Sequence, residues 1–213
     1  MTEIRAVFFD FGGVLLKFMD GIDHKAIEER LGLEERTLMR CLYRESRYMD
    51  FQVGKCTHDE WMASVIDAIG RHCGEKKEAV IEAWENAERP LNWDMLGLVG
   101  RLRQADYRTG IISNTIPGME DRLRELDSTL EPERRLIPIF DVRIGSGDIG
   151  IAKPDPEIYL HAANAIGLEP QQCAFTDDVA KYAEAARDVG MQGFYFQGYE
   201  QFVADLRSVG VDC

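Results

Sequence analysis

The sequence predicts an α/β fold, in which a parallel β-sheet is covered by helices and carries an α-helical insertion. Short apolar runs separated by helical patterns predict the sheet and its covering helices. The long stretch between Phe9 and Gly110 holds several helical patterns and no strong strand candidate, which predicts the insertion.

Five short apolar runs are the candidate strands, in the order in which they occur along the chain. They are Ala6–Phe9, 110–112, 137–144, 173–175 and 191–196. A helical pattern, with apolar residues spaced three or four positions apart, precedes each of the last four runs. These patterns start near Met95, Met119, Ile158 and Val179. Gly167 and Gly190 stand where the last two helices should end, because glycine accepts the left-handed conformation of a helix C-cap.

The insertion is expected to span residues 17–90 as a helical cap, leaving 1–16 and 91–213 as the sheet domain. One helical pattern begins at Ile22 and ends at Gly32. Thr57 and Glu60 form a capping-box pattern, which predicts the start of a second helix that carries Trp61. A third pattern contains Trp84, and Pro90 should end it. The spacing of the two tryptophans favours packing inside the cap over a stacking surface for a ligand.

Composition narrows the classes of function. The 213 residues include 25 Lys+Arg and 38 Asp+Glu, a net charge of −13 that repels nucleic acid and anionic lipid. No apolar run reaches the roughly 18 residues of a membrane span, and the N-terminus does not read as a signal peptide. The five cysteines are scattered without metal-ligand spacing, as in reduced proteins. We therefore expect a cytoplasmic protein with no nucleic-acid or membrane partner.

Residues able to carry chemistry follow four of the expected strands. They are Asp10 with Gly12 and Gly13, Ser113 with Asn114, Lys153 beyond a glycine-rich loop, and Asp177 with Asp178. Ligands of open α/β sheets bind beyond the carboxyl ends of the strands, so these residues should meet at one edge. Gathered carboxylates repel each other unless a cation joins them, and Mg²⁺ is the most plausible one. A lysine, a hydroxyl and backbone amides beside it indicate a phosphoryl-transfer site, with Asp10 as a possible nucleophile.

With these residues in order, the chain resembles the haloacid dehalogenase-like hydrolase superfamily. The matching segments are FFDFGGVLL (8–16), GIISNT (110–115), AKPDPEIY (152–159) and FTDDVAKYAEAARDVGM (175–191). The resemblance implies a Rossmann-like, doubly wound parallel sheet, and the insertion lies where this superfamily has its type 1 helical cap.

The resemblance also implies a role for each of these residues. Asp10 would form an aspartyl-phosphate, Ser113 would bind the transferred phosphoryl group, and Lys153 would neutralise both nucleophile and phosphate. Asn114 and the Gly12-Gly13 turn would contribute to substrate binding. Mg²⁺ would be held by Asp10, the Gly12 carbonyl and Asp178, with Asp177 close by.

Gly12 departs from the pattern of phosphatases in the superfamily. These enzymes usually place a second aspartate there, which protonates the leaving oxygen and later activates water. Losing such a group typically costs about 10²–10⁴ in rate. If the missing acid limits turnover, Gly12→Asp should raise activity. Tyr182 is a second departure, where the superfamily often has Asn, and its place on an apolar helix face favours a role in packing.

Three functions remain open at this stage. The first is a Mg²⁺-dependent phosphatase of a small phosphorylated metabolite, with a good leaving group or with an acid supplied by the cap or the substrate. His24 is a candidate acid, and Arg44, Arg47 and Lys55 are candidate phosphate contacts in the cap. The second is a weakly active or non-enzymatic protein that binds metal or phosphate and acts in regulation. The third is a 2-haloacid dehalogenase, which the Gly12-Gly13 pair and the adjacent acids disfavour.

Overall fold

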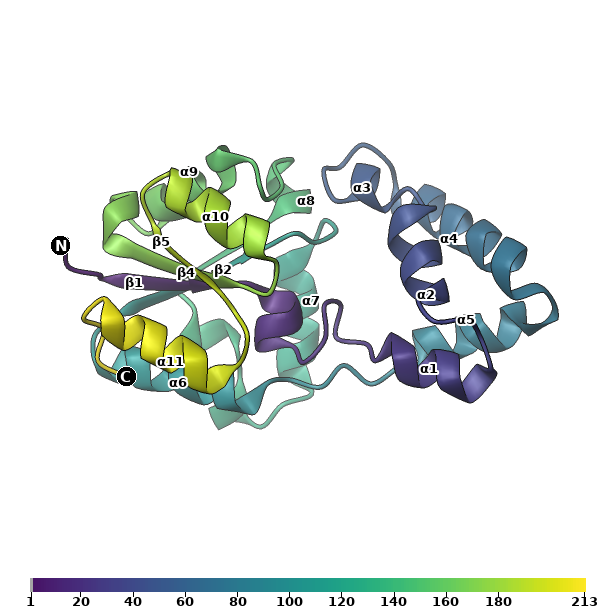
Figure 1. The fold of residues 1–213 in the computed structure, drawn as a ribbon, viewed down its shortest axis with the longest axis horizontal. Coiled ribbons are helices and arrows are strands. Elements are labelled where there is room, and N and C mark those ends of the chain that lie inside the picture. Colours follow the sequence, from purple (N-terminus) through teal and green to yellow (C-terminus); the bar gives the residue numbers. More distant parts are fainter. Residues whose placement is uncertain (1) are drawn as a thin grey trace.

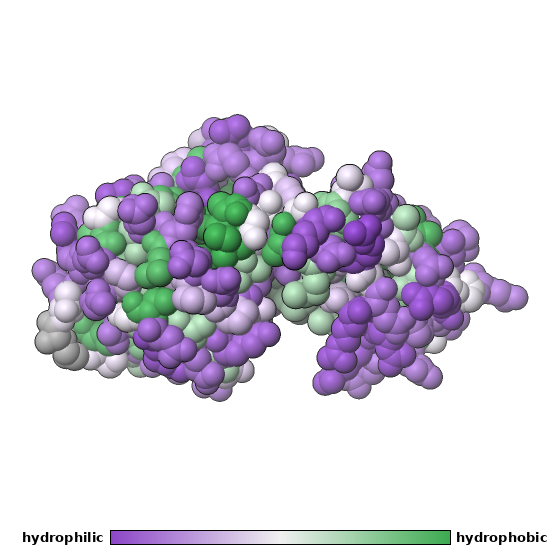
Figure 2. Space-filling model, turned by 90° about the horizontal axis from the view of Figure 1, so that it is seen from above, coloured by the Kyte–Doolittle hydropathy of each residue, from purple (hydrophilic) through white to green (hydrophobic). Residues whose placement is uncertain are grey.

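The computed structural model describes residues 2–213, which form two lobes (Figure 1). The larger lobe holds a parallel β-sheet with helices on both faces. The smaller lobe is formed by the helices that lie between the first strand and the helix Trp93–Gln104. Figure 2 shows a narrower waist between the lobes and a largely hydrophilic outer surface on the smaller one. The predicted α/β fold with a helical insertion is confirmed.

The five strands of the sheet are parallel and lie in the order β3-β2-β1-β4-β5. Their bounds are Ala6–Phe9 (β1), Arg108–Ser113 (β2), Val142–Gly145 (β3), Cys173–Asp177 (β4) and Gln192–Tyr195 (β5). β1 is central, with Phe9 beside Ile111 of β2 and Thr176 of β4. Being paired on both edges and covered on both faces, β1 is a continuous buried apolar run. The carboxyl ends of β1, β2 and β4 meet at one edge of the sheet.

Helices cover the two faces of the sheet. In the larger lobe they are α6 (Trp93–Gln104), α7 (Met119–Ser128), α8 (Ser146–Ile149), α9 (Pro156–Ala165), α10 (Ala180–Asp188) and α11 (Tyr199–Ser208). Successive residues of a strand point to opposite faces. Val7 and Phe9 therefore pack in the apolar cluster with α6, α7 and α11, while Phe8 packs with α9 and α10. This two-sided cover is the doubly wound arrangement that we expected.

The smaller lobe has an apolar core of its own. Its helices are α1 (His24–Leu31), α2 (Thr37–Met39), α3 (Tyr48–Phe51), α4 (His58–Cys73) and α5 (Lys77–Glu85). Gly32 ends α1 in the left-handed conformation, and the capping box of Thr57 and Glu60 starts α4, both as predicted. Trp61 and Trp84 are buried in this core with their rings edge to face, which confirms that they pack inside the lobe.

Two connecting segments lie antiparallel to each other where the chain passes between the lobes. Leu16 forms a β-bridge with Leu91, and the Lys17 amide donates a hydrogen bond to the Pro90 carbonyl at 3.0 Å. The predicted cap bounds, 17 and 90, fall in these segments. The division into a sheet domain, residues 1–16 and 91–213, and a helical cap, residues 17–90, stays a prediction.

The expected strand 137–144 is wrong in its first half. Only Val142–Gly145 is a strand, and Ile137–Ile139 forms a short helical turn. Proline 138 has no N–H to give to a sheet ladder, and the Ile137 amide donates instead to the Asp127 carboxylate at 2.9 Å. An apolar run alone does not reveal this competing partner.

All five cysteines are free, as expected, and three of them are buried. Within residues 2–213 no helix has both the length and the apolar character that crossing a bilayer requires.

Removing the cap of α4 should destabilise the smaller lobe. We expect Thr57→Ala to lower the free energy of unfolding by about 1 kcal/mol, because the Glu60 amide at the helix start loses its acceptor. Urea unfolding followed by circular dichroism measures the change. Thr57→Ser keeps a hydroxyl and should retain most of the stability; equal losses in both variants would contradict the assignment.

Candidate active site

The predicted site residues come together at the carboxyl edge of the sheet. Asp10 directly follows β1, Ser113 ends β2, and Asp177 ends β4. Lys153 reaches them from the loop between α8 and α9. Four segments that are distant in sequence thus supply one site, because parallel strands all end on the same side.

Lys153 is the central group of this cluster. Its Nζ lies 2.8 Å from Asp10 Oδ1, 2.6 Å from Asp177 Oδ2 and 3.0 Å from the Ile112 carbonyl oxygen. The lysine is only 3% exposed. Burial by itself lowers the pKa of Lys153, but the charges of Asp10 and Asp177 outweigh it and raise the pKa, so the ammonium stays charged. A buried lysine needs such partners to remain ionised.

Three carboxylates in the site fit a divalent cation. Asp10, Asp177 and Asp178 each offer an oxygen, and these oxygens all lie within 4.8 Å of one another. Burial, followed by the charge of Asp10, raises the pKa of Asp177 to about 7 and that of Asp178 to about 6. The free carboxylates thus carry more negative charge than this environment tolerates, and hard oxygen ligands in this number suit Mg²⁺.

Ser113 and Asn114 lie in the same site but differ in the availability of their polar groups. Ser113 is 6% exposed, and its hydroxyl has no hydrogen-bond partner within residues 2–213. The side-chain amide of Asn114 instead forms two hydrogen bonds with the backbone of Lys153. It donates to the Lys153 carbonyl at 2.8 Å and accepts from the Lys153 N–H at 2.7 Å. Asn114 also contacts the Tyr182 hydroxyl at 3.4 Å, and the Tyr182 ring packs against the core, as predicted.

The Gly12-Gly13 turn is tightly enclosed. A Cβ on Gly13 would lie 2.2 Å from Asp178 Oδ2, and the φ of Gly13 is +74°. Both the close contact and the left-handed backbone conformation therefore exclude a side chain at this position. A Cβ on Gly12 would lie 1.6 Å from the Met19 carbonyl oxygen. Backbone thus fills the space for a side chain at position 12, so Gly12→Asp would force the loop to shift, and its effect on activity stays a prediction.

The cap residues that sequence reasoning selected do not face the site. His24 is buried, with Nε2 3.0 Å from Asp20 and Nδ1 3.2 Å from the Met39 sulfur. Arg47 pairs with Asp50, and neither it, Arg44 nor Lys55 lines the cavity beside the site. The orientation of these side chains depends on acidic partners in the fold and on the direction of their helices. A single sequence shows neither of these.

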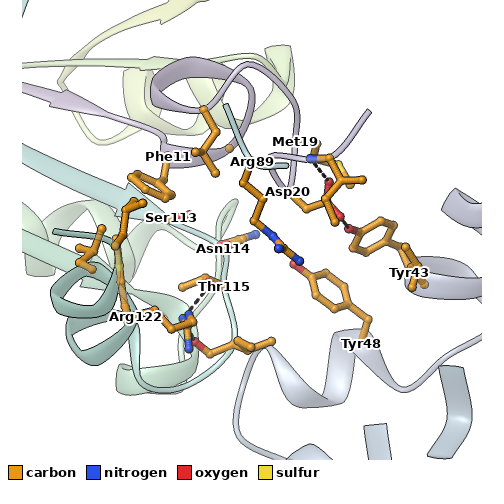
Figure 3. Close-up of a pocket in the computed structure, with 18 of the residues that line it drawn as sticks. Phe11, Met19, Asp20, Tyr43, Tyr48, Arg89, Ser113, Asn114, Thr115 and Arg122 are labelled. Atoms are coloured by element: carbon orange, nitrogen blue, oxygen red, sulfur yellow. Dashed lines mark hydrogen bonds between the residues drawn. The ribbon is translucent and has the colours of Figure 1, made fainter. Parts of the chain in front are cut away.

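A cavity of about 510 Å³ lies between the lobes and reaches the site at Gly12, Ser113 and Asn114. Figure 3 shows Phe11 and Ser113 on the side of the larger lobe, with Arg89 extending into the space between the two sides.

Sequence reasoning missed several residues of the cavity wall: Asp20, Tyr43, Tyr48, Arg89 and Arg122. Arg89 lies at the exit of the cap, beside the Pro90 that we used only as a helix terminator. Nothing in its sequence spacing marks it.

The chain belongs to the haloacid dehalogenase-like hydrolases, because the family model with that description matches residues 4–190. The order of the strands and the acidic cluster at the edge of the sheet agree with this class of hydrolases.

Similar proteins were found by sequence and by structure. Bifunctional epoxide hydrolase 2 of Sus scrofa is 26% identical over 220 residues, which cover 97% of this chain and 39% of that protein. This chain thus spans about two fifths of that relative's length. Sesquiterpene phosphatase astK of Aspergillus oryzae is 26% identical over 209 residues, covering 98% of this chain and 97% of that protein.

Among solved structures, a HAD family enzyme of Bacteroides thetaiotaomicron in complex with magnesium and inorganic phosphate aligns with a TM-score of 0.67 and 18% identity. The alignment covers 93% of this chain and 98% of that one. At this identity the likeness shows the fold.

Magnesium should stabilise the protein more at neutral than at acidic pH. Because the pKa values of Asp177 and Asp178 are raised above 3.8 in the fold, the folded protein holds more protons than the unfolded chain between roughly pH 4 and 7. The metal-free protein therefore loses stability as pH rises through this range. Mg²⁺ replaces the protons, so its effect on Tm should be larger at about pH 7.5 than at about pH 5. Thermal unfolding in EDTA or Mg²⁺ measures this difference.

Asp178→Asn should abolish most of the magnesium effect, whereas Asp188→Asn, at the exposed end of α10, should keep it. An equal magnesium shift at both pH values, or in both variants, would show that the acidic cluster is not the metal site.

Gly12→Ala tests the enclosure of the turn. Overpacking of this kind typically costs about 1–3 kcal/mol of stability. Gly100→Ala is the matched control, because a Cβ at this position in α6 meets nothing within 4 Å and should stabilise the helix by about 0.5–1 kcal/mol. Urea unfolding of both variants provides the comparison, and a neutral Gly12→Ala would show that the loop is looser than described.

Proposed function

We propose that the protein is a Mg²⁺-dependent phosphatase of phosphate monoesters that acts through an aspartyl-phosphate on Asp10. The observation that carries the proposal is the buried Lys153 between Asp10 and Asp177, next to a cavity whose wall includes the neighbouring Gly12 and Ser113. A relative named a phosphatase over its whole length, and a neighbouring structure in complex with magnesium and inorganic phosphate, support it.

In the proposed reaction an Asp10 carboxylate oxygen attacks phosphorus. The new oxygen–phosphorus bond forms as the ester bond breaks, and the leaving oxygen carries away the electron pair of that bond. The Lys153 ammonium, 2.8 Å from Asp10, orients the nucleophile and offsets negative charge at the reacting centre. The unpartnered Ser113 hydroxyl would donate a hydrogen bond to a phosphoryl oxygen. Water then hydrolyses the aspartyl-phosphate and restores Asp10.

The metal would be held by Asp10, Asp178 and the Gly12 carbonyl, with Asp177 nearby. When bound, Mg²⁺ neutralises phosphate charge and so lets an anionic nucleophile approach an anionic substrate. Asp177 would keep Lys153 in place from the other side, through its 2.6 Å ion pair.

The leaving group receives no proton from position 12, where there is no side chain and no room for one. Asp20 lies in the cavity wall but does not serve as an acid. Although burial raises its pKa, hydrogen bonds from His24 and Tyr43 lower it below the ordinary range, so Asp20 is ionised. The site therefore suits esters whose leaving oxygen departs with little help, such as aryl or acyl phosphates.

Removal of the nucleophile tests the function. With saturating Mg²⁺, the wild-type protein should release phosphate from 4-nitrophenyl phosphate and acetyl phosphate, and Asp10→Asn should lower kcat/KM by at least about 10³-fold. Asp188→Asn is the control for the same change of charge at an exposed position and should leave the rate unaltered.

Two outcomes would contradict the proposal. A folded, Mg²⁺-loaded protein that releases no phosphate from any ester would instead support a binding or regulatory role. Metal-independent chloride release from a 2-haloacid would support a dehalogenase.

A further inference from the structure

Several polar side chains in the cavity wall are already committed to the protein. Arg122 donates to the carbonyls of Pro117 and Ile116 and to the Thr115 hydroxyl, the last at 3.1 Å. The Asn114 amide is occupied by the backbone of Lys153. These groups form the wall of the cavity but have little capacity left for a ligand.

Asp20 is committed in the same way. Its carboxylate accepts from the Tyr43 hydroxyl, from the His24 ring at 3.0 Å and from the Ile22 amide at 3.1 Å. Figure 3 shows Tyr43 pointing at Asp20 across one side of the cavity. Additional hydroxyl groups of a ligand would have to compete with these bonds.

Two polar side chains of the cavity wall, Ser113 and Arg89, have spare hydrogen-bonding capacity. The Ser113 hydroxyl has no partner within residues 2–213, and the Arg89 guanidinium makes a single hydrogen bond, to the Ala87 carbonyl at 3.3 Å. Tyr48 also lines the cavity, but its hydroxyl is hydrogen-bonded to the Gln52 side chain. Ser113 and Arg89 are thus available to hold a phosphate.

The remaining wall is elongated and mostly apolar, although Glu125 and Thr129 of α7 also line it. On α7, the lining residues Met119, Leu123 and Leu126 recur at helical spacing and place one face of the helix along the cavity. From Met119 to Leu126 this face extends about 10 Å at 1.5 Å per residue. The facing lobe contributes Trp61 and Trp84. The volume of about 510 Å³ has room for on the order of fifteen non-hydrogen atoms at ~30 Å³ each.

We infer that the substrate is a phosphate monoester with an extended apolar body, aromatic next to the phosphate, and not a sugar phosphate or another polyhydroxylated ester. The inference rests on the proposed phosphatase function and names the substrate class of that same site. Met119, Leu123 and Leu126 offer no partner to the hydroxyl groups of a polyhydroxylated body, whereas an apolar body gains about 0.8 kcal/mol for each methylene buried against them.

A series of 4-alkylphenyl phosphates tests the inference, because the leaving group is nearly the same throughout the series. Between phenyl phosphate and 4-butylphenyl phosphate we expect kcat/KM to rise at least tenfold, with up to about fourfold for each methylene. A 4-(2,3-dihydroxypropyl)phenyl phosphate of similar size should show no such gain. Equal rates across the series, or a preference for the diol, would overturn the inference.

Substitutions in the wall give an independent readout. Met19 lines the cavity and is 43% exposed, so Met19→Gln should fold. It should lower the ratio of kcat/KM for 4-butylphenyl over phenyl phosphate by about threefold. Met49, which is 65% exposed and lies outside the cavity, is the matched control, and Met49→Gln should leave the ratio unchanged. An unchanged ratio in Met19→Gln would place the alkyl group elsewhere.

Calorimetry separates the two proposals. In the presence of Mg²⁺, 4-butylbenzylphosphonate, which cannot be hydrolysed, should bind at least tenfold more tightly than benzylphosphonate and with a more negative heat-capacity change. If it does so while no ester is cleaved, the phosphatase proposal fails and the ligand class stands. If esters are cleaved without any gain from the alkyl group, the phosphatase stands and the ligand class fails.

Discussion

The ion pairs of Lys153 are the interaction on which the rest of the site depends. An ammonium buried to 3% exposure is tolerable only because Asp10 and Asp177 lie 2.8 and 2.6 Å away. The same contacts keep two carboxylates near each other, and the third, Asp178, adds a charge that one lysine does not balance. The protein without metal therefore holds a site with excess negative charge, which a divalent cation would balance.

The turn after β1 constrains both the chemistry and the entry of the substrate. Gly13 makes room for the Asp178 carboxylate, and Gly12 makes room for the Met19 carbonyl. Through this second contact the chain that leads into the smaller lobe is packed directly on the nucleophile's own loop. Met19 and Asp20 thus become part of the cavity wall beside Gly12. The contact between Met19 and Gly12 therefore both excludes a side chain at position 12 and shapes this part of the cavity wall.

Much of the fold and of the reacting centre could be predicted, and the reasons are local. A buried parallel strand must be a continuous apolar run, and residues just after such runs must share one edge. That logic located Asp10, Ser113 and Asp177. It failed at Ile137, where a proline and the Asp127 carboxylate redirected an apolar run. His24, which was a candidate acid by its position alone, forms a hydrogen bond with Asp20 in the folded chain, and the sequence does not show this contact.

By itself, the sequence determined the sheet, the helical insertion and the residues at the strand ends, because periodicity and strand-end position are properties of neighbouring residues. The tertiary structure alone decided which polar groups remain available to a ligand. Arg122 and Asp20 are committed to partners within the fold, while Ser113 and Arg89 keep spare capacity. Hydrogen-bond partners and a cavity between two lobes arise from contacts between distant segments, and no local pattern in one sequence records them.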